Sequence, residues 1–200
     1  SGDLSYRSML EPLLSMDATK PQLAAEAARA LGQLGAVDAQ PALLALSQRR
    51  QEPGVAILVA DALARLKHPE GIRILLDLIE HGEPEIRIRA ASLLLEQGNL
   101  AGAPMLWERV SRGNLSEMAS LVTLGQLAFA GEQQAHQMLD STLQRASGKA
   151  RLFAAWNLGR LGDEKARAIL LAAAAQPGED QLLAAQLAAA LGEPQGYDLL

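Results

Sequence analysis

The sequence predicts an all-α fold, a right-handed α–α superhelix of about six stacked helical hairpins. Hydrophobic residues make up 49% of the chain, yet only 3% of the residues are aromatic. The apolar residues are therefore mostly Leu and Ala, which are strong helix formers, whereas strands favour β-branched and aromatic residues. A short motif that recurs along the whole chain, with Gly and Pro at its boundaries, completes the case.

The recurring motif is a small apolar helix followed by a closing residue that suits a left-handed helix cap. Ala27 to Gly35 and Ala154 to Gly162 show it most clearly. The spacings between successive closing residues are 32, 31, 30, 34 and 30, and the larger step coincides with extra residues at 129–131. Each repeat has room for two helices of about 11 to 14 residues. The six closing residues are Gly35, Lys67, Gly98, Ala128, Gly162 and Gly192.

Helix boundaries follow from Pro at first turns and Gly after last turns. The first helix is expected near Ser8 to Ser15, and the chain ends inside another helix at residues 194–200. Residues 3–200 are expected to form one domain, and a place within a longer protein stays open. Ser1 and Gly2 look like a tag remnant. The second helix of each pair is expected at 22–34, 54–66, 84–97, 115–128, 149–161 and 180–191.

Composition excludes several classes of protein. The formal net charge of −5 and the sequence pI of about 5.2 argue against a nucleic-acid partner, since phosphate binding depends on clustered Lys and Arg. The absence of Cys removes disulfides, thiolate metal sites and a Cys nucleophile. No stretch reaches the roughly 18 apolar residues of a membrane span. A cytoplasmic location is expected, and a periplasmic one stays open.

Catalytic and metal-binding patterns are also missing. His68 and His81 each stand two residues before a Glu, but thirteen residues of helix and turn place them on the order of 20 Å apart, too far to share a metal ion. No phosphate loop, nucleophile elbow or catalytic triad spacing is found. The sequence alone therefore predicts no metal, no cofactor, no catalytic residue and no enzymatic activity.

Two segments resemble a known family. Residues 81–98, with Glu83-Pro84-Glu85 and a closing Gly98, and residues 151–163, with Leu158-Gly159-Arg160-Leu161-Gly162, look like the short HEAT repeats of the phycobilin-lyase-like class. The resemblance extends from about Ser8 to Leu200. It implies a HEAT-repeat α-solenoid in which the first helix of each pair is the outer one and the second is the inner one.

The inner helices would line a concave surface, the usual recognition surface of such solenoids. On the third inner helix, the exposed ridge is predicted at Glu85, Arg89, Ser92 and Glu96, and the first copy is similarly polar. The aligned ridge positions change character in the next two copies, to Leu115, Ala119, Val122 and Gln126 and then to Lys149, Phe153, Trp156 and Arg160.

Aromatic side chains beside Arg are typical of protein-binding hot spots. The alternative is that the extra residues at 129–131 rotate the fourth helix and that Trp156 only fills space between repeats. Trp107, on an expected outer helix at 104–110, is assigned to packing. The predicted partner-binding residues are Arg89, Val122, Gln126, Lys149, Phe153, Trp156 and Arg160.

The main functional prediction is a non-catalytic scaffold that binds a protein or peptide partner on its concave face. The resemblance implies an alternative, a bilin lyase-like chromophore-attachment subunit. DNA binding is disfavoured because Glu26, Glu85 and Glu96 stand among the Arg residues of the ridge and would repel phosphate.

Overall fold

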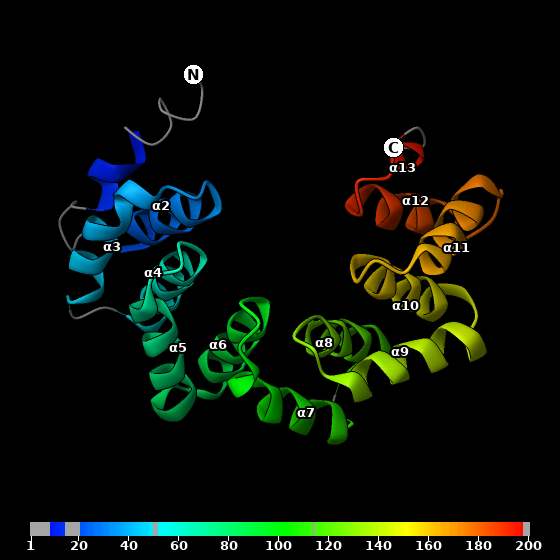
Figure 1. Ribbon diagram of the computed structural model, residues 1–200, viewed down its shortest axis with the longest axis horizontal. Helices are drawn as coiled ribbons and strands as arrows, with labels where there is room; N and C mark the ends of the chain where they lie inside the picture. The colour runs from blue at the N-terminus through cyan, green and yellow to red at the C-terminus, as the bar shows by residue number, and fades with distance from the viewer. Residues whose placement is uncertain (1–8, 15–20, 50–51, 114, 198–200) are drawn as a thin grey trace. The chain divides into compact units, whose positions relative to one another are not determined.

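The computed structural model describes residues 9–14, 21–49, 52–113 and 115–197, and every regular element in these ranges is a helix (Figure 1). The chain divides into two compact units, unit 1 from Ser1 to Met105 and unit 2 from Leu106 to Leu200, with the division inside α7. Ser1 and Gly2, assigned to a tag, and the far ends of the two terminal helices expected from the sequence lie outside the described residues.

Unit 1 stacks its helices in chain order around a core of Leu and Ala. Helix α4 packs against α2, α3, α5 and α6, and its side chains Ile57, Val59 and Leu63 are fully buried. Its regular elements are α2 (Pro21–Gln33), η1 (Val37–Ala39), α3 (Gln40–Ser47), α4 (Pro53–Arg65), α5 (Pro69–His81), α6 (Pro84–Glu96), η2 (Leu100–Gly102) and the beginning of α7 (Ala103–Ser111).

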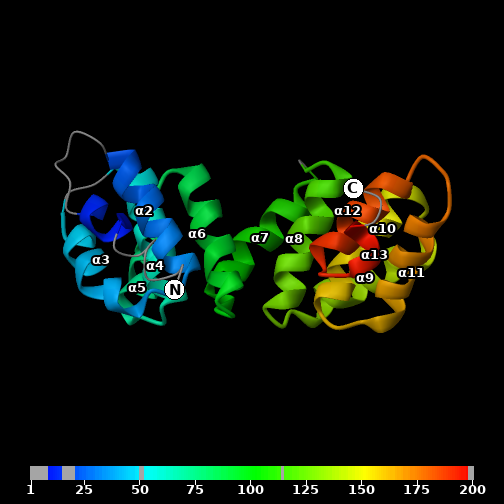
Figure 2. The same cartoon turned by 90° about the horizontal axis from the view of Figure 1, so that it is seen from above.

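Unit 2 repeats the arrangement. Helix α10 packs against α8, α9, α11 and α12. Figure 2 shows the helices of this unit from a second direction. Leu127, Leu139, Leu158 and Leu170 are buried between these helices. The helices of the unit after α7 are α8 (Glu117–Phe129), α9 (Gln133–Arg145), α10 (Gly148–Arg160), α11 (Glu164–Ala175), α12 (Gln181–Ala190) and α13 (Pro194–Tyr197).

The all-α hairpin architecture predicted from the sequence is confirmed. The second helices of the pairs are α2, α4, α6, α8, α10 and α12, and each begins and ends within two residues of its predicted bounds. The amphipathic spacing and the capping residues were sufficient for this, because both are local properties of a helix.

One repeat boundary was predicted three residues too early. Ala128 lies inside α8, and the residue with left-handed backbone after that helix is Gly131, at φ 103°. The corresponding residues in the other repeats are Gly35, Lys67, Gly98, Gly162 and Gly192, so the true spacings are 32, 31, 33, 31 and 30. The fourth repeat therefore has no insertion, and its ridge alignment shifts by three residues.

The N-terminus of α5 gives a prediction about pH. His68 Nδ1 accepts a hydrogen bond from the Glu70 backbone N–H at 3.3 Å, and the Arg73 guanidinium donates to the Glu70 carboxylate at 2.6 and 2.8 Å. The Arg73 hydrogen bonds lower the pKa of Glu70 below its ordinary value. The small stabilisation from this pair is present above the unfolded-state pKa and is lost as the pH falls through the folded-state pKa. An NMR titration of Glu70 should show the lowered pKa, and Arg73→Gln should return this pKa toward its ordinary value. The same Glu70 pKa with and without Arg73 would contradict the role given to the Arg73 hydrogen bonds.

Candidate functional site

Helix α10 presents two aromatic rings on one side. Phe153 and Trp156 are three residues apart, both half-buried, and their ring centroids lie 6.4 Å apart at an interplanar angle of 78°. This edge-to-face geometry is a favourable one for aromatic pairs. The two side chains are therefore partly packed and partly open to solvent, and a binding role for Trp156 stays a prediction.

Arg160 extends the pair toward α8. Its guanidinium carbon lies 5.0 Å from the centroid of the Trp156 ring and 5.7 Å from that of Phe129, both within the range of a cation–π interaction. Phe129 is 50% exposed, and Arg160 is exposed as well. We call the surface formed by Phe129, Phe153, Trp156 and Arg160 the aromatic face.

A buried amide fixes α10 against α8 beneath this surface. Asn157 is 2% exposed, and its Nδ2 donates to the carbonyl oxygens of Leu121 at 3.2 Å and Phe153 at 2.9 Å. The amide fits because Gly125 faces it: a Cβ at that position would lie 1.8 Å from Asn157 Oδ1. The register of α8 on α10, and with it the place of Phe129 beside Arg160, depends on this contact.

Two buried polar atoms at the site have no hydrogen-bond partner among the described residues. They are Asn157 Oδ1 and Trp156 Nε1. Most buried polar atoms in proteins are paired, so each unpaired one requires an explanation. Asn157 Oδ1 belongs to an amide whose Nδ2 already donates two hydrogen bonds. Trp156 Nε1 belongs to a ring of the aromatic face.

In unit 1, the repeat position of Arg160 is occupied by Arg65, which forms ion pairs. Arg65 Nε donates to Asp61 Oδ1 at 2.9 Å, and Arg65 Nη2 donates to Glu96 Oε2 at 2.8 Å. Burial disfavours the charged guanidinium, but the hydrogen bonds and charges of Asp61 and Glu96 outweigh this and raise the pKa of Arg65. Arg65 precedes the left-handed residue Lys67 by two positions, as Arg160 precedes Gly162.

The structure brings three of the predicted binding residues, Phe153, Trp156 and Arg160, into one cluster. Val122, on α8, is 38% exposed, and Lys149, at the start of α10, is exposed. Of the other two predicted residues, Gln126 on α8 is half-buried. Arg89 on α6 is exposed and belongs to unit 1. A binding role for these residues stays a prediction.

Phe129 was missed because the fourth repeat was aligned on Ala128. Once Gly131 is taken as the closing residue, Phe129 occupies the same repeat position as Arg65 and Arg160. The more even spacing was the signal in the sequence that could have found it. Trp107 is half-buried, and its Nε1 donates to Glu132 Oε2 at 3.4 Å, as expected of a packing residue.

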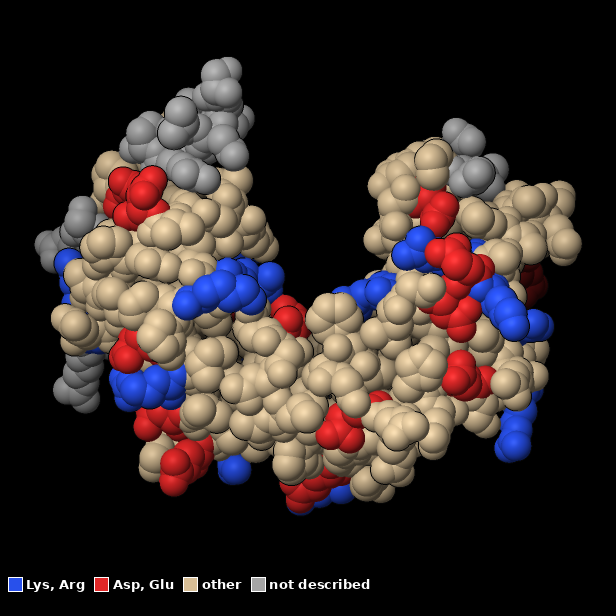
Figure 3. Space-filling view, in the orientation of Figure 1, with Lys and Arg blue, Asp and Glu red and all other residues tan. Residues whose placement is uncertain are grey.

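Charge on the rest of the surface is mixed. Figure 3 shows Lys and Arg side chains interspersed with Asp and Glu side chains within each unit, and Arg167, for example, lies 3.7 Å from both Glu164 and Glu193. The described residues contain no cluster of three or more His, Cys, Asp or Glu that could hold a metal ion. None of the described helices is long and apolar enough to cross a membrane.

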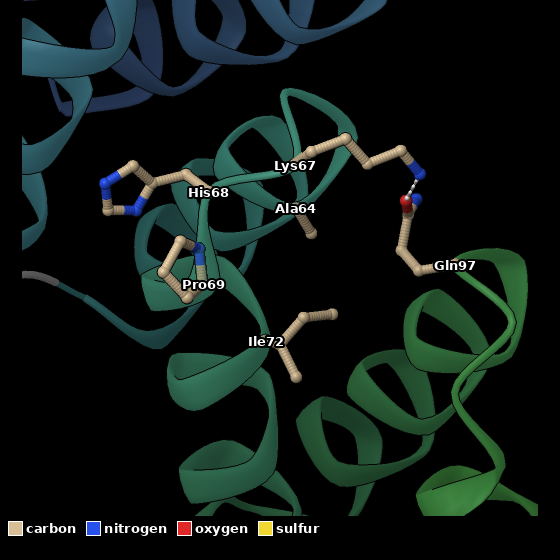
Figure 4. Close-up of a pocket in the computed structure, with 6 residues that line it drawn as sticks. All are labelled: Ala64, Lys67, His68, Pro69, Ile72 and Gln97. Atoms are coloured by element: carbon tan, nitrogen blue, oxygen red, sulfur yellow. Dashed lines mark hydrogen bonds between the residues drawn. The ribbon is translucent and has the colours of Figure 1, made fainter.

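Two surface pockets lie away from the aromatic face. The first, in unit 1, has a volume of about 190 Å³ and is spanned by Lys67 Nζ and Gln97 Oε1 at 3.5 Å (Figure 4). Ligand pockets usually have about 300–1,000 Å³ and few polar groups. The second, in unit 2, has about 310 Å³, lies between α10 and α11, and includes the charged side chains of Arg151 and Asp180. Neither pocket is lined by Phe, Tyr or Trp.

Comparison with protein families identifies the repeats. Residues 8–96 and 41–124 match the model of HEAT repeats, which together is more than half of the chain. The chain belongs to the HEAT-repeat family. Residues 150–176 match the PBS lyase HEAT-like repeat, and this segment contains nearly all of α10 and α11. No curated protein shows a significant match to the sequence.

The fold of this HEAT-repeat chain is similar to that of a solved lyase structure. The similar chain belongs to the complex of CpcE and CpcF of phycocyanin lyase from Nostoc sp. PCC7120, with a TM-score of 0.53 and 19% sequence identity. The match covers 93% of the present chain and 77% of the other chain. At this identity, the likeness establishes a shared fold.

These comparisons contradict the prediction that the chain has no enzymatic activity. The repeat at residues 150–176 is of the PBS lyase type, and the similar fold comes from a phycocyanin lyase complex. The prediction was wrong because it relied on catalytic motifs. The lyase-type repeat is recognised instead by helix caps and core positions, such as Asp163 at the start of α11, which carry no catalytic motif.

Proposed function

We propose that this chain is a bilin lyase-like subunit that holds an open-chain tetrapyrrole chromophore on its aromatic face during attachment to an acceptor protein. The observation that carries the proposal is that the lyase-type repeat and three residues of the aromatic face occupy the same segment of the chain. The segment that matches the PBS lyase HEAT-like repeat, residues 150–176, includes Phe153, Trp156 and Arg160.

The chemistry of the face suits such a ligand. A bilin is a conjugated, flat molecule, and it can stack on exposed aromatic rings or beside a guanidinium. Phe129 and Trp156 flank Arg160 at 5.7 and 5.0 Å, and Phe129 is half exposed. Because the chain contains no Cys, it offers no thiol for covalent attachment, and it would hold the chromophore non-covalently.

The proposal includes a protein partner. The similar solved structure is a complex of two proteins, CpcE and CpcF, and the present chain covers 77% of one of its chains. We infer that this chain also acts with a second subunit and with the acceptor that receives the chromophore. Reconstitution of the attachment reaction requires both partners, whereas chromophore binding can be tested on this chain alone.

The test uses biliverdin as the probe and the fluorescence of Trp156 as the signal. A Trp107→Phe background leaves Trp156 as the single Trp of the chain. We expect biliverdin to quench its emission saturably and to acquire an induced circular dichroism signal. Denaturation in acidic urea should release all of the pigment. The matched variant Trp156→Phe, which keeps Trp107, should show much weaker quenching.

Absence of a saturable change with biliverdin, in a chain that circular dichroism shows to be folded, would overturn the chromophore-binding role. Equal quenching of Trp156 in the Trp107→Phe variant and of Trp107 in the Trp156→Phe variant would place the ligand away from the aromatic face.

A further inference from the structure

The repeats provide an internal comparison for Arg160. In α4 and α10, an Arg stands two residues before the left-handed residue and four residues after a partner on the same helix. In α4 that partner is Asp61, a carboxylate 2.9 Å from Arg65. In α10 it is Trp156, whose ring lies 5.0 Å from the Arg160 guanidinium. An aromatic ring has replaced the carboxylate.

The second carboxylate partner of Arg65 also has no equivalent beside Arg160. Glu96, at the same position of the next second helix, completes the ion pair of Arg65 at 2.8 Å. The residue at that position after Arg160 is Ala190, the last residue of α12. In the part of unit 2 that the structure describes, the Arg160 side chain forms no ion pair and no hydrogen bond, and its guanidinium lies against rings.

The two helices that carry these positions supply no carboxylate. Helix α10 has no acidic residue, and α12 has no charged residue at all. The buried Trp156 Nε1 is a further donor without an acceptor. In a chain with a net charge of −5, the guanidinium of Arg160 thus stands at the aromatic face without a carboxylate partner among the described residues.

We propose that Arg160 is a carboxylate-binding residue and that the aromatic face takes a flat conjugated ligand with at least one free carboxylate. The ligand carboxylate occupies the role that Asp61 has toward Arg65, and the rings of Trp156 and Phe129 contact the conjugated part. This inference deepens the proposed function and rests on it for the identity of the ligand as a bilin.

The expected effect follows from the strength of charge-assisted hydrogen bonds. A guanidinium binds a carboxylate through two parallel N–H···O bonds, and this geometry is more specific than that of a point charge. Loss of such a pair should weaken binding by on the order of 10- to 100-fold. Arg160→Gln keeps a polar side chain of similar length and removes the charge.

The experiment compares biliverdin with its dimethyl ester, which lacks free carboxylates, in the Trp107→Phe background. We expect the unmodified face to bind the acid more tightly than the ester by about tenfold or more. Arg160→Gln should bind both at the affinity of the ester. The matched control is Arg151→Gln, which removes the same charge from α10 on the side that faces α11 and should keep the preference for the acid.

Equal binding of acid and ester by the parent chain would overturn the assignment of Arg160, and so would an equal loss in the Arg151 and Arg160 variants. Pyrenebutyrate and its methyl ester, tested in parallel, separate this inference from the proposed function. A carboxylate preference that depends on Arg160 with pyrene, without binding of either bilin, would retain the carboxylate site and remove the bilin role. Absence of a carboxylate preference with both ligand pairs would overturn the site.

Discussion

Gly71→Ala is expected to destabilise unit 1 by about 2–3 kcal/mol, an overpacking effect near the upper end of the usual range. Gly71, in the first turn of α5, is buried against α4. A Cβ at this position would lie 2.3 Å from the backbone nitrogen of Ala64 and 2.7 Å from the carbonyl oxygen of Ala60. These are backbone atoms of a packed helix, so relief requires α5 to move away from α4.

The matched control is Gly54→Ala, in the first turn of α4, where no atom lies within 4 Å of the added Cβ. This change should be neutral or stabilising by up to about 1 kcal/mol, because Gly has more freedom to lose on folding than Ala. Urea unfolding followed by circular dichroism measures both. Equal midpoints for the two variants would show that α5 does not depend on the close approach to α4.

The crossing at Gly71 recurs in each repeat, and this part of the fold is visible in the sequence. Four residues after each of the six left-handed residues that close the second helices stands a Gly or Ala, and all six of these small residues are buried. The small side chain lets the first helix of one pair approach the second helix of the pair before it. The positions are Ala39, Gly71, Gly102, Ala135, Ala166 and Gly196.

The candidate site was only partly predictable, for reasons of geometry. Phe153, Trp156 and Arg160 share one helix, so their spacing alone places them on one side. Phe129 comes from another helix, and its approach to Arg160 depends on the rotation of α8. Leu124-Gly125-Gln126-Leu127 repeats Leu31-Gly32-Gln33-Leu34 in sequence, and aligning the two motifs places the end of α8 at Ala128. The helix continues to Phe129, and the left-handed turn is delayed to Gly131.

That rotation is fixed by a residue whose role appears only in the structure. Nothing in the sequence distinguishes Asn157 from an exposed helical Asn, yet it is 2% exposed and its amide bonds to the Leu121 carbonyl of α8. Gly125, which in sequence looks like a weak point in a helix, provides the space for it. A large effect is therefore expected from a change of one atom at position 157.

Asn157→Asp is expected to destabilise unit 2 by about 3–5 kcal/mol at pH 7, the usual effect of leaving a buried charge without a partner. An ionised carboxylate has no donor, so the carbonyl oxygens of Leu121 and Phe153, now 3.2 and 2.9 Å from Nδ2, would face a negative charge. At acidic pH, the protonated carboxyl regains one O–H donor. The loss relative to the parent chain should therefore be smaller at pH 4 than at pH 7, when urea midpoints are compared at the two values.

The control is the same substitution at Asn99, where the side-chain oxygen accepts a hydrogen bond from the Ala101 backbone N–H at 3.0 Å. An Asp keeps that acceptor, and the change should stay within about 0.5 kcal/mol. Similar losses at both positions would contradict the donor role of Asn157. If the amide sets the register of α8, Asn157→Asp examined below its unfolding midpoint should also weaken biliverdin quenching of Trp156, because Phe129 would no longer be held beside Arg160. Full quenching in that variant would separate the stability of unit 2 from the geometry of its aromatic face.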